Sequence, residues 1–259
     1  MELPELIARI GPPDESARAA ARSRWNACAK PLGSLGLLEA AIEEIAALTG
    51  SADVSLARKA VLVFCADNGV VAQGVTQTGS GVTAAVARQL ALGRTSVCRM
   101  AAVAECRVVP VDLGIRDFSG CEGVLDRRVG NGTADLTEAP AMTRAQAERA
   151  ILTGAELVRE EAARGVRLLA AGEMGIGNTT TAAAVVCALL GLPGKRSQAA
   201  ARGFPTRRWR ARSRRSGAGS SGTAPTRETR WTCWQSSAAL TSRGCAARFS
   251  EARCTVCRC

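Results

Sequence analysis

The stretch Gly172–Thr181 reads Gly-Glu-Met-Gly-Ile-Gly-Asn-Thr-Thr-Thr and holds the residue types that a phosphate site needs. Its three glycines let the backbone approach a phosphate without interference from a Cβ atom. Asn178 or Thr179 can cap a following helix, and Glu173 supplies one carboxylate. These residues predict anion binding. A glycine-rich turn without a ligand fits the same pattern, because a single glycine loop is weak evidence.

The elements on either side place this stretch at a helix N-terminus. Residues 166–171 form a short apolar run typical of a buried strand, and residues 179–190 are rich in alanine, as in a helix. At the start of a helix, free N–H groups and the helix dipole favour an anion. We expect Glu173 in the loop after the strand, where open α/β sheets bind their ligands.

A second group of polar residues follows another predicted strand. Residues 59–65 are mostly apolar, and Asp67 and Asn68 come just after them. Both side chains could contact a ligand at the same edge of the sheet, although Asp and Asn also favour turns that bind nothing. Residues 70–81 form a long polar, glycine-rich loop, which we expect to line a substrate site.

The rest of the first 190 residues alternates helices with strands. A further apolar strand is predicted at 107–113. Ser34 is placed to cap one helix and Thr143 another. This alternation predicts an α/β fold, with a parallel sheet covered by helices on both faces. Helical spacing occurs at residues 14–29, 35–48, 82–92, 95–104 and 143–164.

Composition excludes several kinds of chemistry. The 259 residues include no histidine and no tyrosine, so imidazole acid–base catalysis and His-based metal sites are excluded. Residues 1–5 do not form a secretory n-region and no apolar run approaches the length of a membrane span, so we expect a cytoplasmic protein without membrane contact. The six cysteines before residue 194 are expected to be reduced and mostly buried.

The charge is divided unevenly along the chain. The net charge is +11, but residues 194–259 carry 15 Lys and Arg against two acidic residues, whereas residues 1–193 sum to −2. Taken literally, the tail is a disordered basic segment, and a nucleic-acid-binding protein that uses it is the alternative function. Cys254, Cys257 and Cys259 lack a fourth partner for a metal site.

The string Gly-Glu-Met-Gly-Ile-Gly-Asn-Thr-Thr-Thr-Ala-Ala-Ala resembles the signature of nicotinate-nucleotide:dimethylbenzimidazole phosphoribosyltransferases. Four more segments agree with that family and stand in the family's order, so the resemblance covers residues 30 to about 193. No Walker A string or Gly-x-Gly-x-x-Gly supports a generic nucleotide-binding enzyme instead. The further segments are Lys30–Gly36, Ala66–Val71, Gly74–Gly79 and Ala139–Thr143.

The resemblance implies a reaction of cobalamin lower-ligand synthesis in a Rossmann-like three-layer fold with a small helical domain. The base 5,6-dimethylbenzimidazole would attack nicotinate mononucleotide, giving α-ribazole 5′-phosphate and nicotinate without a metal or cofactor, in an enzyme that is a homodimer in its intact form. Asn68 stands where the family more often has histidine, and Glu173 would be a secondary acid–base or ribose-binding carboxylate.

By matching positions, the resemblance assigns two groups of binding residues. The nucleotide phosphate and ribose would be held by Gly175, Gly177, Asn178 and Thr179. The pocket for the base would be bordered by Gln77, Thr78 and Ser80.

The tail resembles the same family when its codons are read in another frame. If each new codon joins the last base of one codon to the first two bases of the next, residues 194–204 permit EEVTGRGTGL and residues 229–245 permit PLDVLAKLGGFDIAGL. Both strings resemble the family downstream of its glycine loop. We therefore expect three parts: residues 1–50 of the small helical domain, an α/β nucleotide-binding domain at 51–193, and an out-of-frame basic tail at 194–259. The family's main general base, a glutamate near the true C-terminus, would then be missing.

Overall fold

A parallel four-stranded sheet forms the centre of the chain. The computed structural model describes residues 2–190. The strand order is β3-β2-β1-β4, and every neighbouring pair is parallel. The predicted α/β fold with a parallel sheet is confirmed, and the two-residue strand β3 was not predicted. The strands are β1 (Lys59–Ala66), β2 (Cys106–Gly114), β3 (Leu125–Asp126) and β4 (Leu168–Met174).

The central strand β1 is buried along most of its length, which explains why its sequence is a continuous apolar run rather than an alternating one. In register, Cys65 of β1 lies opposite Asp112 of β2 and Met174 of β4. The three strands therefore end at nearly the same level. The loops that follow them lie together at one edge of the sheet.

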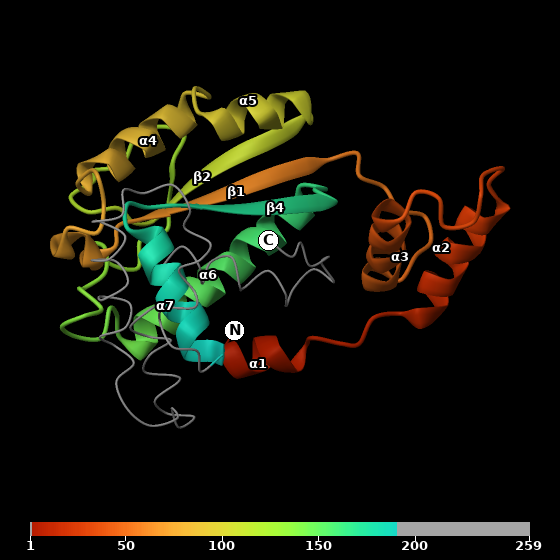
Figure 1. The fold of residues 1–259 in the computed structure, drawn as a ribbon, viewed down its shortest axis with the longest axis horizontal. Coiled ribbons are helices and arrows are strands. Elements are labelled where there is room, and N and C mark those ends of the chain that lie inside the picture. The colour runs from red at the N-terminus through yellow and green to blue at the C-terminus, as the bar shows by residue number, and fades with distance from the viewer. Residues whose placement is uncertain (1, 191–259) are drawn as a thin grey trace.

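Helices cover both faces of this sheet (Figure 1). Helices α4 (Gly81–Ala91) and α5 (Ser96–Val103) cover one face, and α6 (Arg144–Ala163) and α7 (Asn178–Leu190) lie on the other. Each face has its own apolar core. Val63 and Cys65 of β1 pack with residues of α4, and Leu62 and Phe64 pack with residues of α6.

The N-terminus of α6 has the predicted cap. The hydroxyl of Thr143 accepts a hydrogen bond from the backbone N–H of Gln146, at 3.2 Å. The side-chain oxygen of Gln146 accepts one from the backbone N–H of Thr143, at 2.8 Å. This reciprocal pair is a capping box, and it satisfies two N–H groups that the helix itself leaves unpaired.

The first 50 residues form a short helix and a helical hairpin. Helix α1 (Leu3–Ala8) packs against α6, while α2 (Glu15–Ala27) and α3 (Leu37–Thr49) pair with each other to one side of the sheet (Figure 1). The predicted cap at Ser34 is wrong, because α3 begins after Gly36, whose φ is +54°.

A side chain inside α3 holds the turn before it. Glu39 accepts a hydrogen bond from the backbone N–H of Leu35 at 2.9 Å and forms an ion pair of 2.8 Å with Lys30. Lys30 also lies 5.5 Å from the centre of the Trp25 ring. The pairing with Lys30 lowers the pKa of Glu39.

All six cysteines within residues 2–190 are free thiols, as expected. The expectation that most are buried is wrong. Cys65 and Cys187 are buried, Cys28 is exposed and the other three are half-buried. Burial raises the pKa of Cys65 to about 12.

None of the helices described in residues 2–190 is long and apolar enough to span a membrane. The basic tail at 194–259 lies outside the described residues.

Candidate functional site at the carboxyl ends of the strands

The glycine loop begins later than predicted. Strand β4 continues to Met174, so Glu173 lies in the strand and not in the loop. Gly172 and Glu173 have low strand propensity. The strand nevertheless continues through them, because they pair with Val63 and Phe64 of β1. The loop is therefore only Gly175–Gly177.

Helix α7 follows the loop at once, and Asn178 is its first residue. The side-chain nitrogen of Asn178 donates to the Glu173 carboxylate at 2.5 Å, and its side-chain oxygen accepts from the N–H of Thr179 at 2.8 Å. Asn178 thus satisfies one N–H of the first turn and holds the exposed carboxylate beside it. Thr179 lies inside the helix with an exposed side chain, so its predicted alternative role as the cap is wrong.

The two loop glycines are required by packing. A Cβ atom on Gly175 would lie 2.0 Å from the backbone oxygen of Ala66, and one on Gly177 would lie 3.2 Å from the Cβ of Asn68. Gly177 also has a φ of +90°, which disfavours other residues. The Gly177 N–H has no hydrogen-bond partner among residues 2–190. Close contact with the end of β1 and with the residues that follow it therefore explains the glycines, and the Gly177 N–H is without a partner within residues 2–190.

Asp67 and Asn68 are buried and connect several loops. One carboxylate oxygen of Asp67 accepts from the hydroxyl of Thr83 at 2.7 Å, and the other accepts from the N–H of Arg116 at 2.8 Å. Asn68 donates to the backbone oxygen of Ile176 at 3.1 Å and accepts from the Thr181 hydroxyl at 2.9 Å. The structure thus brings both residues to the glycine loop as positioning groups.

Thr83 is the functional residue that the sequence reasoning missed. It lies in the first turn of α4, is fully buried, and accepts a hydrogen bond of 3.2 Å from the N–H of Ile176. Its hydroxyl therefore links Asp67 to the glycine loop. The only sequence signal was a threonine two positions after the polar loop 70–81.

The three residues predicted to border the base pocket lie between η1 (Gly69–Gln73), a short 3₁₀ helix, and α4. Gln77 and Thr78 are exposed, and Ser80 is half-buried at the position before α4 without a side-chain capping bond. None of the three hydrogen-bonds to the glycine loop within the described residues. Their contact with the base stays a prediction. They lie on the loop that leads into α4 and Thr83.

Glu173, Asp67 and Asp112 lie near the carboxyl ends of the strands and differ in burial, since Glu173 is exposed and the other two are buried. Burial raises the pKa of Asp67, against the opposing effect of its hydrogen bonds from Thr83 and Arg116. Burial also raises the pKa of Asp112, one oxygen of which has no hydrogen bond but lies 3.5 Å from Arg128. Glu173 is exposed beside the glycine loop and could exchange a proton with a bound molecule.

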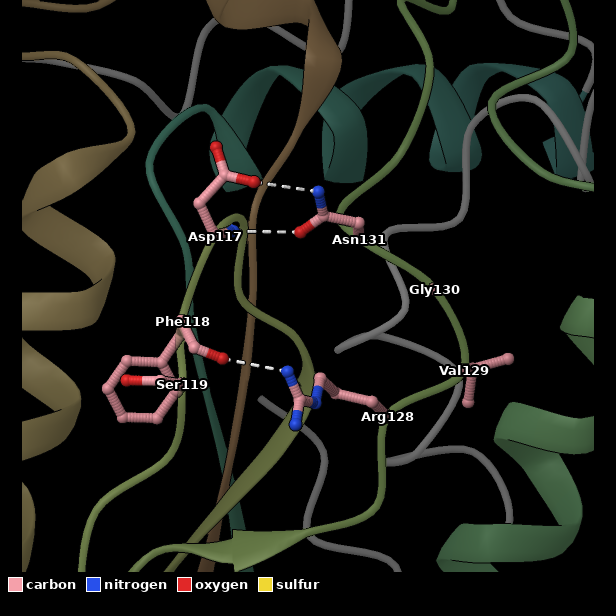
Figure 2. Close-up of a pocket in the computed structure, with 7 residues that line it drawn as sticks. All are labelled: Asp117, Phe118, Ser119, Arg128, Val129, Gly130 and Asn131. Atoms are coloured by element: carbon pink, nitrogen blue, oxygen red, sulfur yellow. Dashed lines mark hydrogen bonds between the residues drawn. The ribbon is translucent and has the colours of Figure 1, made fainter.

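A cavity of about 630 Å³ lies beside this edge of the sheet but contains none of the predicted residues (Figure 2). It is lined by the segments 117–119 and 128–131. Asp117 and Asn131 bond each other there at 2.8 and 3.0 Å, and Arg128 donates to the backbone oxygen of Phe118 at 2.7 Å. Its polar groups are largely paired with one another. Within residues 2–190, no cluster of Cys, Asp and Glu could hold a metal ion.

Comparison with known proteins agrees with this arrangement. A profile described as phosphoribosyltransferase matches residues 10–215, which is most of the chain. The chain belongs to the nicotinate-nucleotide:dimethylbenzimidazole phosphoribosyltransferase family. The family fold, a parallel sheet with helices on both faces, is the one described above.

Relatives that carry this enzyme name are similar to this chain over 62% of its length or more. The phosphoribosyltransferase of Acetivibrio thermocellus is 44% identical over 162 residues, covering 62% of this chain and 46% of that protein. That of Thermus thermophilus is 44% identical over 181 residues, covering 70% and 54%. The chain spans about half the length of the curated relatives it matches.

A solved structure of the Thermus thermophilus phosphoribosyltransferase is also similar, with a TM-score of 0.78. The sequences are 37% identical, and the match covers 92% of this chain and 71% of that one. Neither the profile nor these relatives support the alternative of a nucleic-acid-binding protein.

Proposed function

We propose that the chain carries the nucleotide side of a site that transfers a phosphoribosyl group from nicotinate mononucleotide to 5,6-dimethylbenzimidazole, as the names of its relatives suggest. The bond between C1′ and the nicotinate nitrogen breaks, and a bond from a benzimidazole nitrogen to C1′ forms with inversion. The proton of the benzimidazole passes to a carboxylate or to water. The products are nicotinate and α-ribazole 5′-phosphate, the lower-ligand precursor of cobalamin.

The observation that carries this proposal is the Gly175–Gly177 loop at the start of α7. The unpaired Gly177 N–H and the positive end of the helix dipole suit the phosphate of the nucleotide. Asn178 and Thr179 lie in the first turn of α7, next to the glycine loop. Asn178 holds the Glu173 carboxylate beside this turn. This arrangement suits Glu173 to a ribose hydroxyl or to a secondary acid–base role.

The benzimidazole is proposed to lie against the loop that contains Gln77, Thr78 and Ser80. This loop enters α4 at the same edge of the sheet as Asp67 and the glycine loop. The chain is only 3% aromatic, so aliphatic side chains and backbone would form most of the contact with the ring. No nucleic acid, membrane or metal has a part in the proposed reaction.

We also propose that this chain turns over slowly or not at all. If residues 194–259 are read from a shifted frame, the main general base of the family and a second phosphate loop are missing. Losing a general base costs on the order of 10²–10⁴ in rate. The intact form would be a cytoplasmic homodimer, in which residues 1–50 belong to a small helical domain and residues 51–193 to the nucleotide-binding domain.

The test uses the chain with its reading frame restored near codon 193. Purified protein is mixed with nicotinate mononucleotide and 5,6-dimethylbenzimidazole, and release of nicotinate is measured. We expect turnover, and we expect Glu173→Gln to slow it. A matched control is Glu148→Gln on the surface of α6, which should leave the rate unchanged. No release by the restored protein would contradict the proposed reaction, and an unchanged rate in Glu173→Gln would contradict the role of Glu173.

A further inference from the structure

The backbone N–H and C=O of Ile176, which belong to the two consecutive peptide groups of the glycine loop, are each fixed by a side chain from another element. Its N–H donates to the hydroxyl of Thr83 in α4 at 3.2 Å. Its carbonyl oxygen accepts from the side-chain nitrogen of Asn68, after β1, at 3.1 Å. The middle of the glycine loop is therefore held between the ends of two other elements.

These anchors matter because Ile176 lies between two glycines. Glycine populates positive and negative φ about equally, so the two peptide groups between Gly175 and Gly177 have little orientational preference of their own. If they turned, the Gly177 N–H and the first turn of α7 would point elsewhere. The sequence of the loop alone does not determine how these peptide groups are oriented. The hydrogen bonds to Thr83 and Asn68 determine it.

The hydroxyl of Thr83 is in turn held in one orientation. It accepts from Ile176, so its own hydrogen is directed to the carboxylate of Asp67, at 2.7 Å. The second oxygen of Asp67 is taken by the N–H of Arg116 at 2.8 Å. Thr83 and Asp67 are buried, with 0% and 1% of their surfaces exposed, so water cannot replace these bonds.

We propose that Thr83 is a positioning residue, which fixes the peptide group between Gly175 and Ile176 so that, together with the bond from Asn68 to the next peptide group, the glycine loop presents its N–H groups to the phosphate of the nucleotide. Thr83 does not touch the substrate in this account, and it acts through Ile176. The inference rests on the proposed function for its ligand, nicotinate mononucleotide. The anchoring of the loop can be measured without any ligand.

The test compares three variants of the full chain. Thr83→Val keeps the shape of the side chain and removes both hydrogen bonds, while Thr83→Ser keeps the hydroxyl and loses only a methyl group. Thr153→Val is the matched control, because Thr153 is also buried but lies in α6 on the opposite face of the sheet. Circular dichroism at the working temperature shows which variants are folded.

The first readout is hydrogen exchange at the amide of Ile176 without ligand. We expect protection in the unaltered chain, in Thr83→Ser and in Thr153→Val, and fast exchange in Thr83→Val. The measurement on the unaltered chain needs no variant to fold. Fast exchange there, or equal protection in Thr83→Val, would overturn the inference that Thr83 fixes the loop.

The second readout is a calorimetric titration with nicotinate mononucleotide. If only about a tenth of the Thr83→Val molecules hold the loop in the binding conformation, the apparent Kd rises roughly tenfold. Thr83→Ser should restore binding to within about twofold of the unaltered chain. Equal affinity in Thr83→Val, despite fast exchange at Ile176, would overturn the link to binding. No binding by the unaltered chain would contradict the proposed function instead, and the exchange experiment would still decide the anchoring.

Discussion

Replacing Gly175 by alanine tests whether the glycine loop is required to pack against β1. The new Cβ would lie 2.0 Å from the backbone oxygen of Ala66 and 3.0 Å from the side-chain nitrogen of Asn68. Carbon–oxygen contacts normally lie at about 3.3 Å or more, so the loop and the end of β1 must separate by more than about 1 Å. The Ala66 oxygen belongs to the backbone, so the contact with it cannot be relieved by a rotamer change.

The cost follows from what this displacement breaks. The bonds of Ile176 to Asn68 and Thr83 are already 3.1 and 3.2 Å long, near the upper limit for such bonds, and a further ångström removes both. Two buried hydrogen bonds are worth about 1 kcal/mol each, and overpacking adds about 1–3 kcal/mol. We expect Gly175→Ala to lower the free energy of unfolding by about 3–5 kcal/mol.

Urea denaturation followed by circular dichroism measures this loss. With a slope of about 2 kcal/mol per molar urea, the midpoint should fall by about 2 M. The control is Gly172→Ala in the preceding strand β4, where the added Cβ would meet Val63 at an ordinary 3.7 Å. Its midpoint should change by a few tenths of a molar at most. Similar midpoints for the two variants would refute the packing argument.

Two further perturbations test other parts of the structure. Lys30→Met removes the partner that lowers the pKa of Glu39, and the ionised Glu39 stabilises the fold fully above its ordinary pKa of 4.5. In the unaltered chain this contribution is lost as the pH falls through the lowered pKa of Glu39. The free energy of unfolding, measured between pH 3 and 6, should therefore depend less steeply on pH in Lys30→Met than in the unaltered chain. An equally steep curve would contradict the ion pair. Thr143→Ala removes the capping box of α6 and should cost about 1 kcal/mol in urea denaturation, whereas a loss below a few tenths would show that the cap is not formed.

The sequence predicted the order and type of the main elements because their periodicity is strong. The apolar run at 59–65 reflects a strand that is buried on both faces. The amphipathic pattern of 143–164 reflects a helix that is buried on one face. Both patterns can be recognised in the sequence without knowing which residues the element packs against. Thr143 was predicted as a cap because capping is local. These features are determined within a few residues of the position concerned.

Contacts between distant residues could not be predicted in the same way. Glu173 was placed in a loop because the apolar run ends at residue 171 and a glycine-rich stretch follows, yet pairing with β1 extends β4 through Gly172 and Glu173. The hydroxyl of Thr83 bonds to residues 16 and 93 positions away, and no local pattern marks it. From the sequence, the glycines of the loop were explained by the close approach of a phosphate. The structure adds a second reason, because a side chain at Gly175 would collide with the end of β1.

We propose above that this chain keeps the nucleotide side of the site and lacks the main general base of the family. The direct measurement is release of nicotinate by this chain and by its frame-restored form, at equal concentrations of folded protein, with nicotinate mononucleotide and 5,6-dimethylbenzimidazole. We predict steady release by the restored form and a rate lower by about 10²–10⁴ or more for this chain. Comparable rates would show that residues 194–259 serve as a functional substitute, and would contradict the account.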